Sequence, residues 1–269
     1  MKPSERALKV IAFEDRDKWQ GTQHSGRMID WTQWKTYLPE LVCRCAEAAW
    51  KSGQVFFGIQ FFGECWTSVN GNDNFAKYGE VSGAKRCEDS KLNDCNDLST
   101  TACTGVANMN YVYQIVALRE CNFDKDICGF EQDKNDTFDW TRLQGSTRSV
   151  DTGPTGDNTS GKGYYMYIEA SQPRVQNDNA KISHMVTLSG QSCLKFSYHM
   201  YGSNIGTLRV TLSGGVIFEK GGDQGNVWKT FQTRLKGTGS RKLTFEGICG
   251  DDWRGDIAID DVMIYDCQV

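Results

Sequence analysis

Eleven cysteines constrain this chain of 269 residues more than any other feature. They are clustered and interleaved with Gly, Asn and Trp, a usage typical of proteins that fold in an oxidising compartment. The first residues, from Met1 to Arg6, lack the apolar core of a signal peptide and by themselves indicate the cytosol. We give the cysteines more weight, and we expect an extracellular chain whose signal lies upstream. The rival is a cytosolic enzyme with reduced cysteines, in which about eleven thiols would titrate under denaturing, non-reducing conditions.

Length and charge exclude several classes of protein. The chain is long enough for one large domain or two ordinary ones. Its formal net charge of -4 gives no electrostatic case for binding nucleic acid or an anionic membrane. The sequence has no run of about 18 apolar residues, so we expect no direct membrane insertion by this chain. Two N-x-[ST] sequons, at Asn135 and Asn158, are candidate glycosylation sites and agree with an extracellular location.

Residues 1–118 predict a small α+β module. Helical spacing of apolar residues, β-prone runs and a candidate glycine cap at Gly53 predict four elements. These are a strand at 10–13, a helix at 38–51, a buried strand at 55–66 and a closing strand at 111–116. The polar stretch between the last two strands holds three cysteines, and loops of that length need cross-links.

Six cysteines fall in this module, and an even number fits three internal disulfides with 15 connectivities. They are Cys43, Cys45, Cys65, Cys87, Cys95 and Cys103. The sequence does not choose among the connectivities. A metal or redox pair at Cys43 and Cys45 is the alternative, but metal pairs need wider spacing and no histidine lies nearby. We therefore interpret these cysteines as structural.

Residues 119–269 predict an all-β fold. In the central stretch 193–201, Leu194, Phe196 and Tyr198 alternate with Lys and Ser, which indicates a strand with one buried face. Eight such segments, separated by Gly, Ser and Asn turns, predict a β-sandwich or barrel. They are 164–169, 180–188, 193–201, 207–212, 216–220, 228–235, 242–247 and 256–265, with Cys267 beyond the last strand.

Six segments of residues 121–267 resemble, in order, the MAM domain of meprins, neuropilins and receptor tyrosine phosphatases. They are CNFDKDICGFEQD, DWTR, TGDNTSGKGYYMYIEAS, CLKFSYHMYG, GTLRVTL and RGDIAIDDVMIYDC. The resemblance implies a jelly-roll-like antiparallel β-sandwich with disulfides Cys121–Cys128 and Cys193–Cys267. It also implies non-catalytic work outside the cell, in adhesion, in receptor or ligand contacts and in oligomerisation.

Two positions depart from the family pattern. Asn158 stands where the family usually has His. Cys249 stands where the family usually has no cysteine, and three disulfides in the first module plus the two family disulfides leave it unpaired. An odd cysteine in an extracellular chain indicates an intermolecular bond or a buried free thiol. A swapped pairing across the two parts of the chain is also open.

The run CRCAEAAWKSGQVFFGIQFFGECW resembles the WSC module, a small cysteine-rich extracellular domain thought to bind carbohydrate. It departs from that family at Thr67, where another cysteine is frequent, and in having six cysteines in place of eight. The resemblance implies that exposed aromatic side chains near Trp66 are candidates for stacking on sugar rings. The alternative is that they pack a small core. We thus expect a WSC-like module at 1–118 and a MAM domain at 119–269, held close by a short linker around 117–120.

The sequence contains no recognisable catalytic motif. The chain has no H-E-x-x-H, no G-x-S-x-G and no phosphate-binding loop, and we expect no enzyme. Its histidines are scattered, and His199 falls on the polar face of the central strand. The paired carboxylates Asp251-Asp252 and Asp260-Asp261 point to opposite faces of a strand and make no acid–base couple. The tripeptide 254–256, RGD, runs into a strand, so we expect no integrin recognition.

A structural cation is the one cofactor that the MAM resemblance suggests. Loop carboxylates supply the oxygen ligands that Ca²⁺ prefers, and Na⁺ is the other candidate. By resemblance the ligand set is Asp124, Glu131, Asp157 and Asp261. Alternatively, these carboxylates accept hydrogen bonds from turns and backbone amides.

The sequence therefore predicts a small disulfide-rich α+β module followed by a β-sandwich. We expect the pair to act in non-catalytic extracellular recognition, with a protein or glycan ligand and a homo-oligomer as candidate partners. The rival is a non-catalytic fragment of a larger extracellular protease or receptor ectodomain.

Overall fold

The computed structural model describes residues 8–16, 23–68, 83, 85–88, 93, 102–190 and 192–268. The side chains of 116–118, 267 and 268 lie outside the described set, as does the whole of Cys95. The predicted pairing of Cys95 therefore concerns a residue outside the described part of the chain.

The described residues form one long helix and sixteen strands, mostly antiparallel. The first part contains β1 (Val10–Glu14), α1 (Trp34–Lys51), β2 (Phe56–Gln60), β3 (Glu64–Thr67), β4 (Lys85–Cys87), β5 (Cys103–Gly105) and β6 (Tyr111–Cys121). The second part contains β7 (Glu131–Gln132), β8 (Thr141–Gln144), β9 (Tyr164–Ile168), β10 (Asn179–Ser189), β11 (Ser192–Met200), β12 (Thr207–Leu212), β13 (Gly215–Gly221), β14 (Lys229–Arg234), β15 (Thr238–Ile248) and β16 (Ile257–Gln268).

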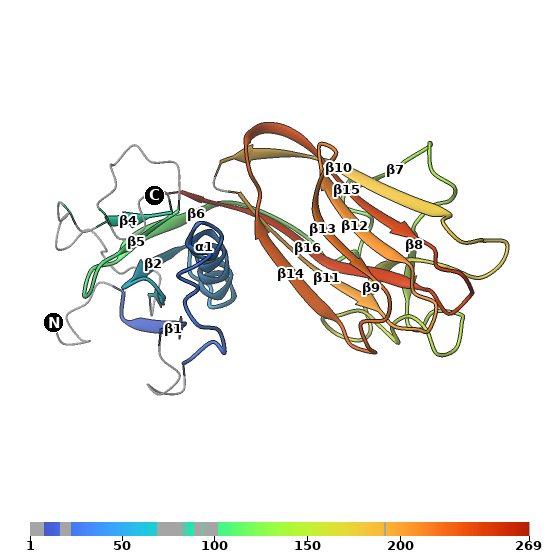
Figure 1. Ribbon diagram of the computed structural model, residues 1–269, viewed down its shortest axis with the longest axis horizontal. Helices are drawn as coiled ribbons and strands as arrows, with labels where there is room; N and C mark the ends of the chain where they lie inside the picture. Colours follow the sequence, from blue (N-terminus) through green and yellow to red (C-terminus); the bar gives the residue numbers. More distant parts are fainter. Residues whose placement is uncertain are drawn as a thin grey trace.

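Two sheets organise these strands. The larger sheet follows the order β1-β3-β2-β6-β16-β11-β14, with β4, β5, β8 and β9 attached beside this path. The smaller sheet has the order β13-β12-β15-β10-β7. In the second part of the chain the two sheets face each other across a hydrophobic core, while α1 lies against the larger sheet in the first part, as Figure 1 shows. The predicted β-sandwich and the predicted α+β module are both present.

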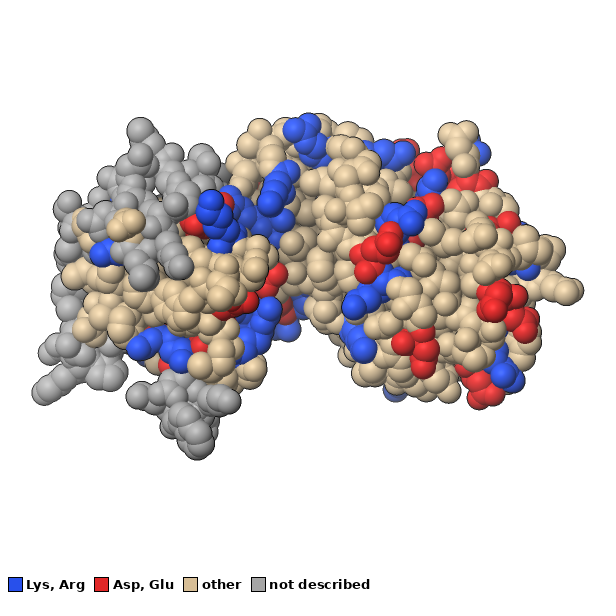
Figure 2. Space-filling model, viewed as in Figure 1, with Lys and Arg blue, Asp and Glu red and all other residues tan. Residues whose placement is uncertain are grey.

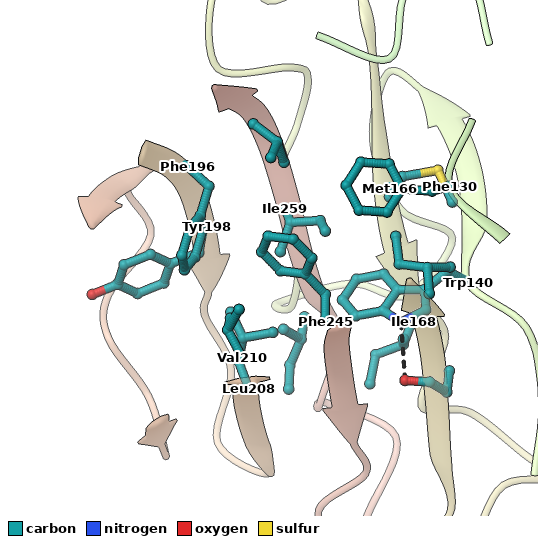
Figure 3. Packing of buried hydrophobic residues seen from close by; sticks show 14 of the residues in the cluster. Phe130, Trp140, Met166, Ile168, Phe196, Tyr198, Leu208, Val210, Phe245 and Ile259 are labelled. Atoms are coloured by element: carbon teal, nitrogen blue, oxygen red, sulfur yellow. Dashed lines mark hydrogen bonds between the residues drawn. The ribbon is translucent and has the colours of Figure 1, made fainter. Parts of the chain in front are cut away.

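All eight strands predicted for the second part are confirmed. Buried positions recur at every second residue in β10, β12 and the second half of β15, whereas β9 and β11 are buried along almost their whole length. In β11, Phe196 is fully buried and packs edge-on against Phe245 of β15, with ring centroids 5.0 Å apart (Figure 3). Trp140 closes one end of this core and donates its indole N–H to the Ala180 carbonyl at 2.9 Å (Figure 3). Cys267, predicted to lie beyond the last strand, instead belongs to β16.

The predicted helix is confirmed and begins one turn earlier, at Trp34. Gly53 follows its end with a φ of +72° and donates its amide to the Trp50 carbonyl at 2.8 Å, a backbone conformation that favours glycine. The single strand expected at 55–66 is wrong. This segment is the hairpin β2–β3, because the chain reverses at Phe61 and Phe62.

The predicted linker around 117–120 is also wrong, since these residues lie inside β6. Residues of the first half of β6 pair with β2, and residues of its second half pair with β16. Figure 1 shows β6 and β16 running lengthwise from one part of the molecule into the other. A continuous ladder of backbone hydrogen bonds thus joins the two parts, where the sequence predicted two modules connected by a linker.

A disulfide also crosses between the parts. Cys43 on α1 is bonded to Cys193 at the start of β11, with 5.9 Å between their Cα atoms. The family pairing Cys193–Cys267 and the prediction of three disulfides confined to 1–118 are therefore wrong, and the swapped pairing left open by the sequence is present. The physical reason is the shared sheet. Cys193 is opposite Tyr265 in β16, on a stretch of sheet that α1 covers.

The remaining described disulfides are local. Cys45 is bonded to Cys65 and Cys87 to Cys103 within the first part. Cys121 is bonded to Cys128, as the family resemblance implied.

Polar contacts add to this junction. The hydroxyl of Tyr265, a buried residue of β16, donates to the Cys43 carbonyl at 2.7 Å and accepts from the Gln232 amide. Lys195 of β11 forms an ion pair with Glu47 of α1, and both side chains are largely shielded from solvent. A ladder, a disulfide and these buried contacts indicate that the two parts behave as one body.

The Glu47–Lys195 pair gives the junction a pH dependence. Burial opposes ionisation of Glu47, but hydrogen bonds and charge from Lys195 and Lys51 outweigh it and lower its pKa below 4.5. Because the Glu47 pKa is lower in the folded chain than in the unfolded chain, the ionised carboxylate stabilises the fold above pH 4.5. This stabilisation is lost as the pH falls through the pKa of the folded state. We expect Glu47→Gln to reduce the free energy of unfolding at pH 7 by roughly 2 kcal/mol, and less at acidic pH. Urea unfolding at both pH values measures this, and an equal loss at both contradicts the assignment.

Candidate recognition surface

The carboxylates suggested as cation ligands serve as hydrogen-bond acceptors for nearby loops. Asp157 accepts from the backbone amides of Ser160 and Gly163 at 2.9 and 2.6 Å. Burial opposes its ionisation, but these bonds outweigh burial and lower its pKa. Asp124 accepts from the Tyr164 amide at 2.9 Å, and Asp261 accepts from the Asn158 side-chain amide at 2.7 Å.

Glu131, the fourth candidate, lies exposed on β7. Among the described residues no group of three or more His, Cys, Asp or Glu side chains is arranged to hold a metal ion. A structural Ca²⁺ or Na⁺ ion stays a prediction, whereas the hydrogen bonds of Asp124, Asp157 and Asp261 match the alternative role predicted for them.

The RGD tripeptide is not presented for recognition. Asp256 is fully buried, its carboxylate accepts from the Ala170 amide at 3.1 Å, and its own amide donates to the Thr152 hydroxyl at 3.0 Å. Burial above all raises the pKa of Asp256 to about 7. An integrin needs an exposed carboxylate, so this segment is a structural one.

Cys249 is a buried free thiol. Its side chain belongs to the sandwich core with 3% exposure, and burial raises its pKa to about 12. A buried, protonated thiol is neither nucleophilic nor accessible to a second chain. Of the two alternatives for Cys249, the structure contains the buried thiol.

The two sequons differ in their surroundings. Asn135 is exposed, and its side-chain amide makes no hydrogen bond within the described part of the chain. Asn158 is also exposed, but its side-chain amide donates to Asp261 and its backbone amide to Asp260. A glycan would replace one proton of that amide and add bulk beside Asp261.

We therefore expect higher glycan occupancy at Asn135 than at Asn158 in chain secreted from animal cells. Glycopeptide mass spectrometry measures the two occupancies, and Asp261→Ala should raise the value at Asn158. Full modification of Asn158 beside an unmodified Asn135 would contradict this expectation.

Aromatic side chains near Trp66 were predicted to be either ligand-stacking or core residues. Trp66 itself is a core residue with 5% exposure, and its indole N–H donates to Glu64 at 2.9 Å. Trp34 is likewise buried and donates to the Cys87 carbonyl at 3.1 Å. Trp31 is an exposed aromatic side chain, at 40% exposure, and it stacks on Trp34 with ring centroids 5.5 Å apart and planes 11° apart.

Other apolar and cationic groups extend this exposed ring into a surface. The ring centroid of Phe62 lies 5.5 Å from that of Trp31, and the centroids of Phe61 and Phe62 lie 5.9 Å apart. The Arg16 guanidinium covers the Phe61 ring, 3.6 Å from the ring centroid. We call the four residues Arg16, Trp31, Phe61 and Phe62 the Trp31 surface.

The backbone of this surface is strained. Phe61 and Phe62 have φ values of +46° and +70° in the turn that connects β2 to β3, closed by the Gly63 amide and the Gln60 carbonyl at 3.3 Å. Bulky residues rarely adopt this left-handed conformation, which costs about 1–2 kcal/mol per residue. Asn-Gly is the favoured pair for such turns. Strain retained at two aromatic positions is typical of functional sites.

Sequence reasoning missed Trp31 as the exposed member of the cluster. Composition does not distinguish Trp31 from Trp34 and Trp66. Their exposure depends on tertiary packing, which buries Trp34 at the start of α1 and Trp66 in β3 but leaves Trp31 exposed. The turn between β2 and β3 brings Phe62 beside Trp31, but the uniformly apolar run at 55–62 gave no sign of that turn.

Charge does not single out another surface. Lys and Arg side chains are intermingled with Asp and Glu side chains over the face of the second part seen in Figure 2. This mixing agrees with the formal net charge of -4. No helix within the described ranges is long and apolar enough to cross a membrane.

Comparison with known proteins covers the second part of the chain. Residues 121–268 match the family model "MAM domain, meprin/A5/mu". A chicken (Gallus gallus) MAM domain-containing glycosylphosphatidylinositol anchor protein 1 is 42% identical over 159 residues, which cover 54% of this chain and 17% of that protein. Thyroid hormone-induced protein B of Xenopus laevis is 39% identical over 153 residues, covering 54% of this chain and 22% of that protein.

Among solved structures, the K3 adhesin domain of Lys-gingipain from Porphyromonas gingivalis aligns with 57% of this chain and 98% of its own length. Its identity is 15% and its TM-score 0.40. The matches to the two relatives above span about a fifth of each relative's length.

Proposed function

The chain belongs to the MAM domain family and is extracellular, and from this we propose that it is a non-catalytic adhesion or recognition unit that binds a protein or glycan ligand. The exposed Trp31 ring, supported from below by Trp34, is the observation that carries the proposal. Tryptophan and arginine are the residues most enriched in binding hot spots, and aromatic rings also stack on sugars. The Trp31 surface combines both residue types on a preorganised base.

Preorganisation favours this surface over a flexible loop. Trp34 is fixed by its hydrogen bond to Cys87, and the amides of Phe61 and Phe62 donate to Gly105 and Thr104. A ligand that meets fixed rings loses less conformational entropy on binding than one that must order them.

The test compares two tryptophans of similar exposure. Trp31 is 40% exposed and Trp50 is 37% exposed, and Trp50 lies about 24 Å from Trp34 at the far end of α1. Soluble, disulfide-bonded chain is titrated onto cultured cells, and binding is measured by flow cytometry. We expect Trp31→Ala to weaken binding by about thirtyfold or more, as for a hot-spot residue, and Trp50→Ala to have little effect. Equal binding by Trp31→Ala and the unmodified chain would overturn the proposal.

A second variant separates binding from stability. Phe61→Asn removes a ring from the Trp31 surface and installs a residue that the turn favours. We expect it to unfold at an equal or higher urea concentration while it binds cells more weakly. Glycosidase and protease treatment of the cells then assigns the ligand to a glycan or a protein.

A further inference from the structure

A second candidate binding site lies in the sandwich, away from the Trp31 surface. The loop between β8 and β9 lines an open hollow of about 330 Å³, completed by Tyr201 after β11 and Asn226 before β14. This volume lies at the lower end of the range of small-ligand sites. The loop lines it with the ten consecutive residues 146–155.

The wall of the hollow is held in place before any ligand arrives. The Thr147 amide donates to the Pro154 carbonyl at 3.3 Å, and the Thr147 hydroxyl to the Thr152 carbonyl at 3.0 Å. The Tyr201 carbonyl accepts from the Thr152 hydroxyl at 2.9 Å and from the Gly153 amide at 3.1 Å. The loop is therefore closed on itself and fastened to β11, so binding would cost little ordering entropy.

Its chemistry is that of hydroxyls and amides. Six lining side chains carry a hydroxyl, one carries an amide, and there is one cation and one anion. Hydroxyls both donate and accept hydrogen bonds, as do the hydroxyls of a sugar. Within the described residues, the Arg148 guanidinium, the Ser146 and Thr155 hydroxyls and the Asn226 Nδ2 group make no hydrogen bond or ion pair.

The Asn226 side chain is oriented from below by a buried histidine. His199 has 2% exposure, its ring lies 5.4 Å from Trp228 and 6.4 Å from Tyr201, and its Nε2 atom is 3.1 Å from Asn226 Oδ1. Burial lowers the His199 pKa, so the ring is neutral at pH 7 and Nε2–H donates to Asn226. The Asn226 oxygen thereby accepts a hydrogen bond from His199, and the Nδ2 group of this exposed residue is left as a donor for a ligand.

The Nδ1 atom of His199 is buried without a hydrogen-bond partner. A buried nitrogen without a partner is unfavourable, and packing alone does not require one here. The other nitrogen of the ring, Nε2, holds the Asn226 side chain at the hollow, which gives the buried histidine a role.

We propose that this hollow is a saccharide-binding site in which Asn226 and Arg148 hydrogen-bond the sugar hydroxyls and Tyr201 contacts the ring. The site is independent of the Trp31 surface. His199 acts on it as a positioning residue, through Asn226.

Saturation-transfer-difference NMR on the full chain tests the site with three probes. These are methyl β-galactoside, methyl N-acetyl-β-glucosaminide and N-acetylneuraminic acid, each at millimolar concentration. We expect at least one probe to bind, and we expect Asn226→Ala and Arg148→Ala each to weaken its binding about tenfold, the effect of losing one good hydrogen bond. Asn135→Ala removes an exposed asparagine elsewhere and should leave binding unchanged, as should Trp50→Ala.

The role of His199 has its own readout. His199→Leu removes the donor to Asn226 and should weaken binding as much as Asn226→Ala does, whereas His199→Gln retains a donor and should restore part of it. If no probe binds the unmodified chain, or if Asn226→Ala binds as tightly as the unmodified chain, the proposal is wrong. The Trp31 surface is tested separately, by the binding of Trp31→Ala chain to cells, so failure at the hollow is distinct from failure of the Trp31 surface.

Discussion

Replacing Cys43 and Cys193 together by alanine is expected to lower the free energy of unfolding by roughly 5 kcal/mol. The disulfide closes a loop of 150 residues, and the entropy that a cross-link removes from the unfolded chain grows with the logarithm of loop length. Urea unfolding of the oxidised chain measures the change. This is the largest single effect that the described disulfides predict.

The matched control is the pair Cys121 and Cys128, which closes a loop of only seven residues. The same relation gives about 2.5 kcal/mol for its removal. If the Cys43–Cys193 replacement costs no more than this control, the long-range disulfide does not constrain the unfolded chain, and the account of the junction is wrong.

Phe196→Ala is expected to cost about 3–5 kcal/mol, because it empties the centre of the sandwich core. Phe196 is fully buried. Its ring centroid lies 5.3, 5.5 and 5.0 Å from the ring centroids of Phe218, Phe231 and Phe245, respectively. Neighbouring side chains on both sheets therefore lose contacts together. Met185→Ala, on the exposed face of β10 at 55% exposure, should change stability by less than about 0.5 kcal/mol. A loss below about 1 kcal/mol for Phe196→Ala would contradict this assignment of the core.

The sandwich was predictable because its signals are local. Strands such as β12 and the second half of β15 alternate apolar and polar residues, and that alternation indicates which face is buried. The helix was predictable for the same reason, since its apolar residues keep one stripe. Trp34 and its neighbours before 38 were missed because a helix start without a capping side chain leaves little trace in sequence.

The junction could not be predicted in the same way. Whether 117–120 is a linker or a strand depends on what lies beside it, and here β2 and β16 supply partners for one continuous β6. The choice of Cys193 as partner for Cys43 follows from that pairing, because the shared sheet brings α1 over the start of β11. The number of cysteines allowed a disulfide between the two parts of the chain but did not identify Cys43 and Cys193 as its members.

For the candidate sites too, the sequence predicted the kinds of residue involved but not their tertiary contacts. Asp124, Asp157 and Asp261 were identified as belonging near loops, but the sequence did not decide between cation ligands and hydrogen-bond acceptors for backbone amides. The aromatic surface was anticipated as a class, whereas Trp31 as its exposed member depends on burial of Trp34 and Trp66 by tertiary packing. The hollow at 146–155 has no sequence signature, since its lining is ordinary loop composition.

Disulfide mapping of the non-reduced, denatured chain tests the central structural claim most directly. Trypsin cleaves after Arg44 and so separates Cys43 from Cys45, which lets mass spectrometry assign each one. The structure predicts a linked pair of peptides containing Cys43 and Cys193, together with a Cys249 thiol that alkylates only after denaturation. A peptide pair linking Cys193 to Cys267 would show that the two parts are closed separately, and would contradict the single body described above.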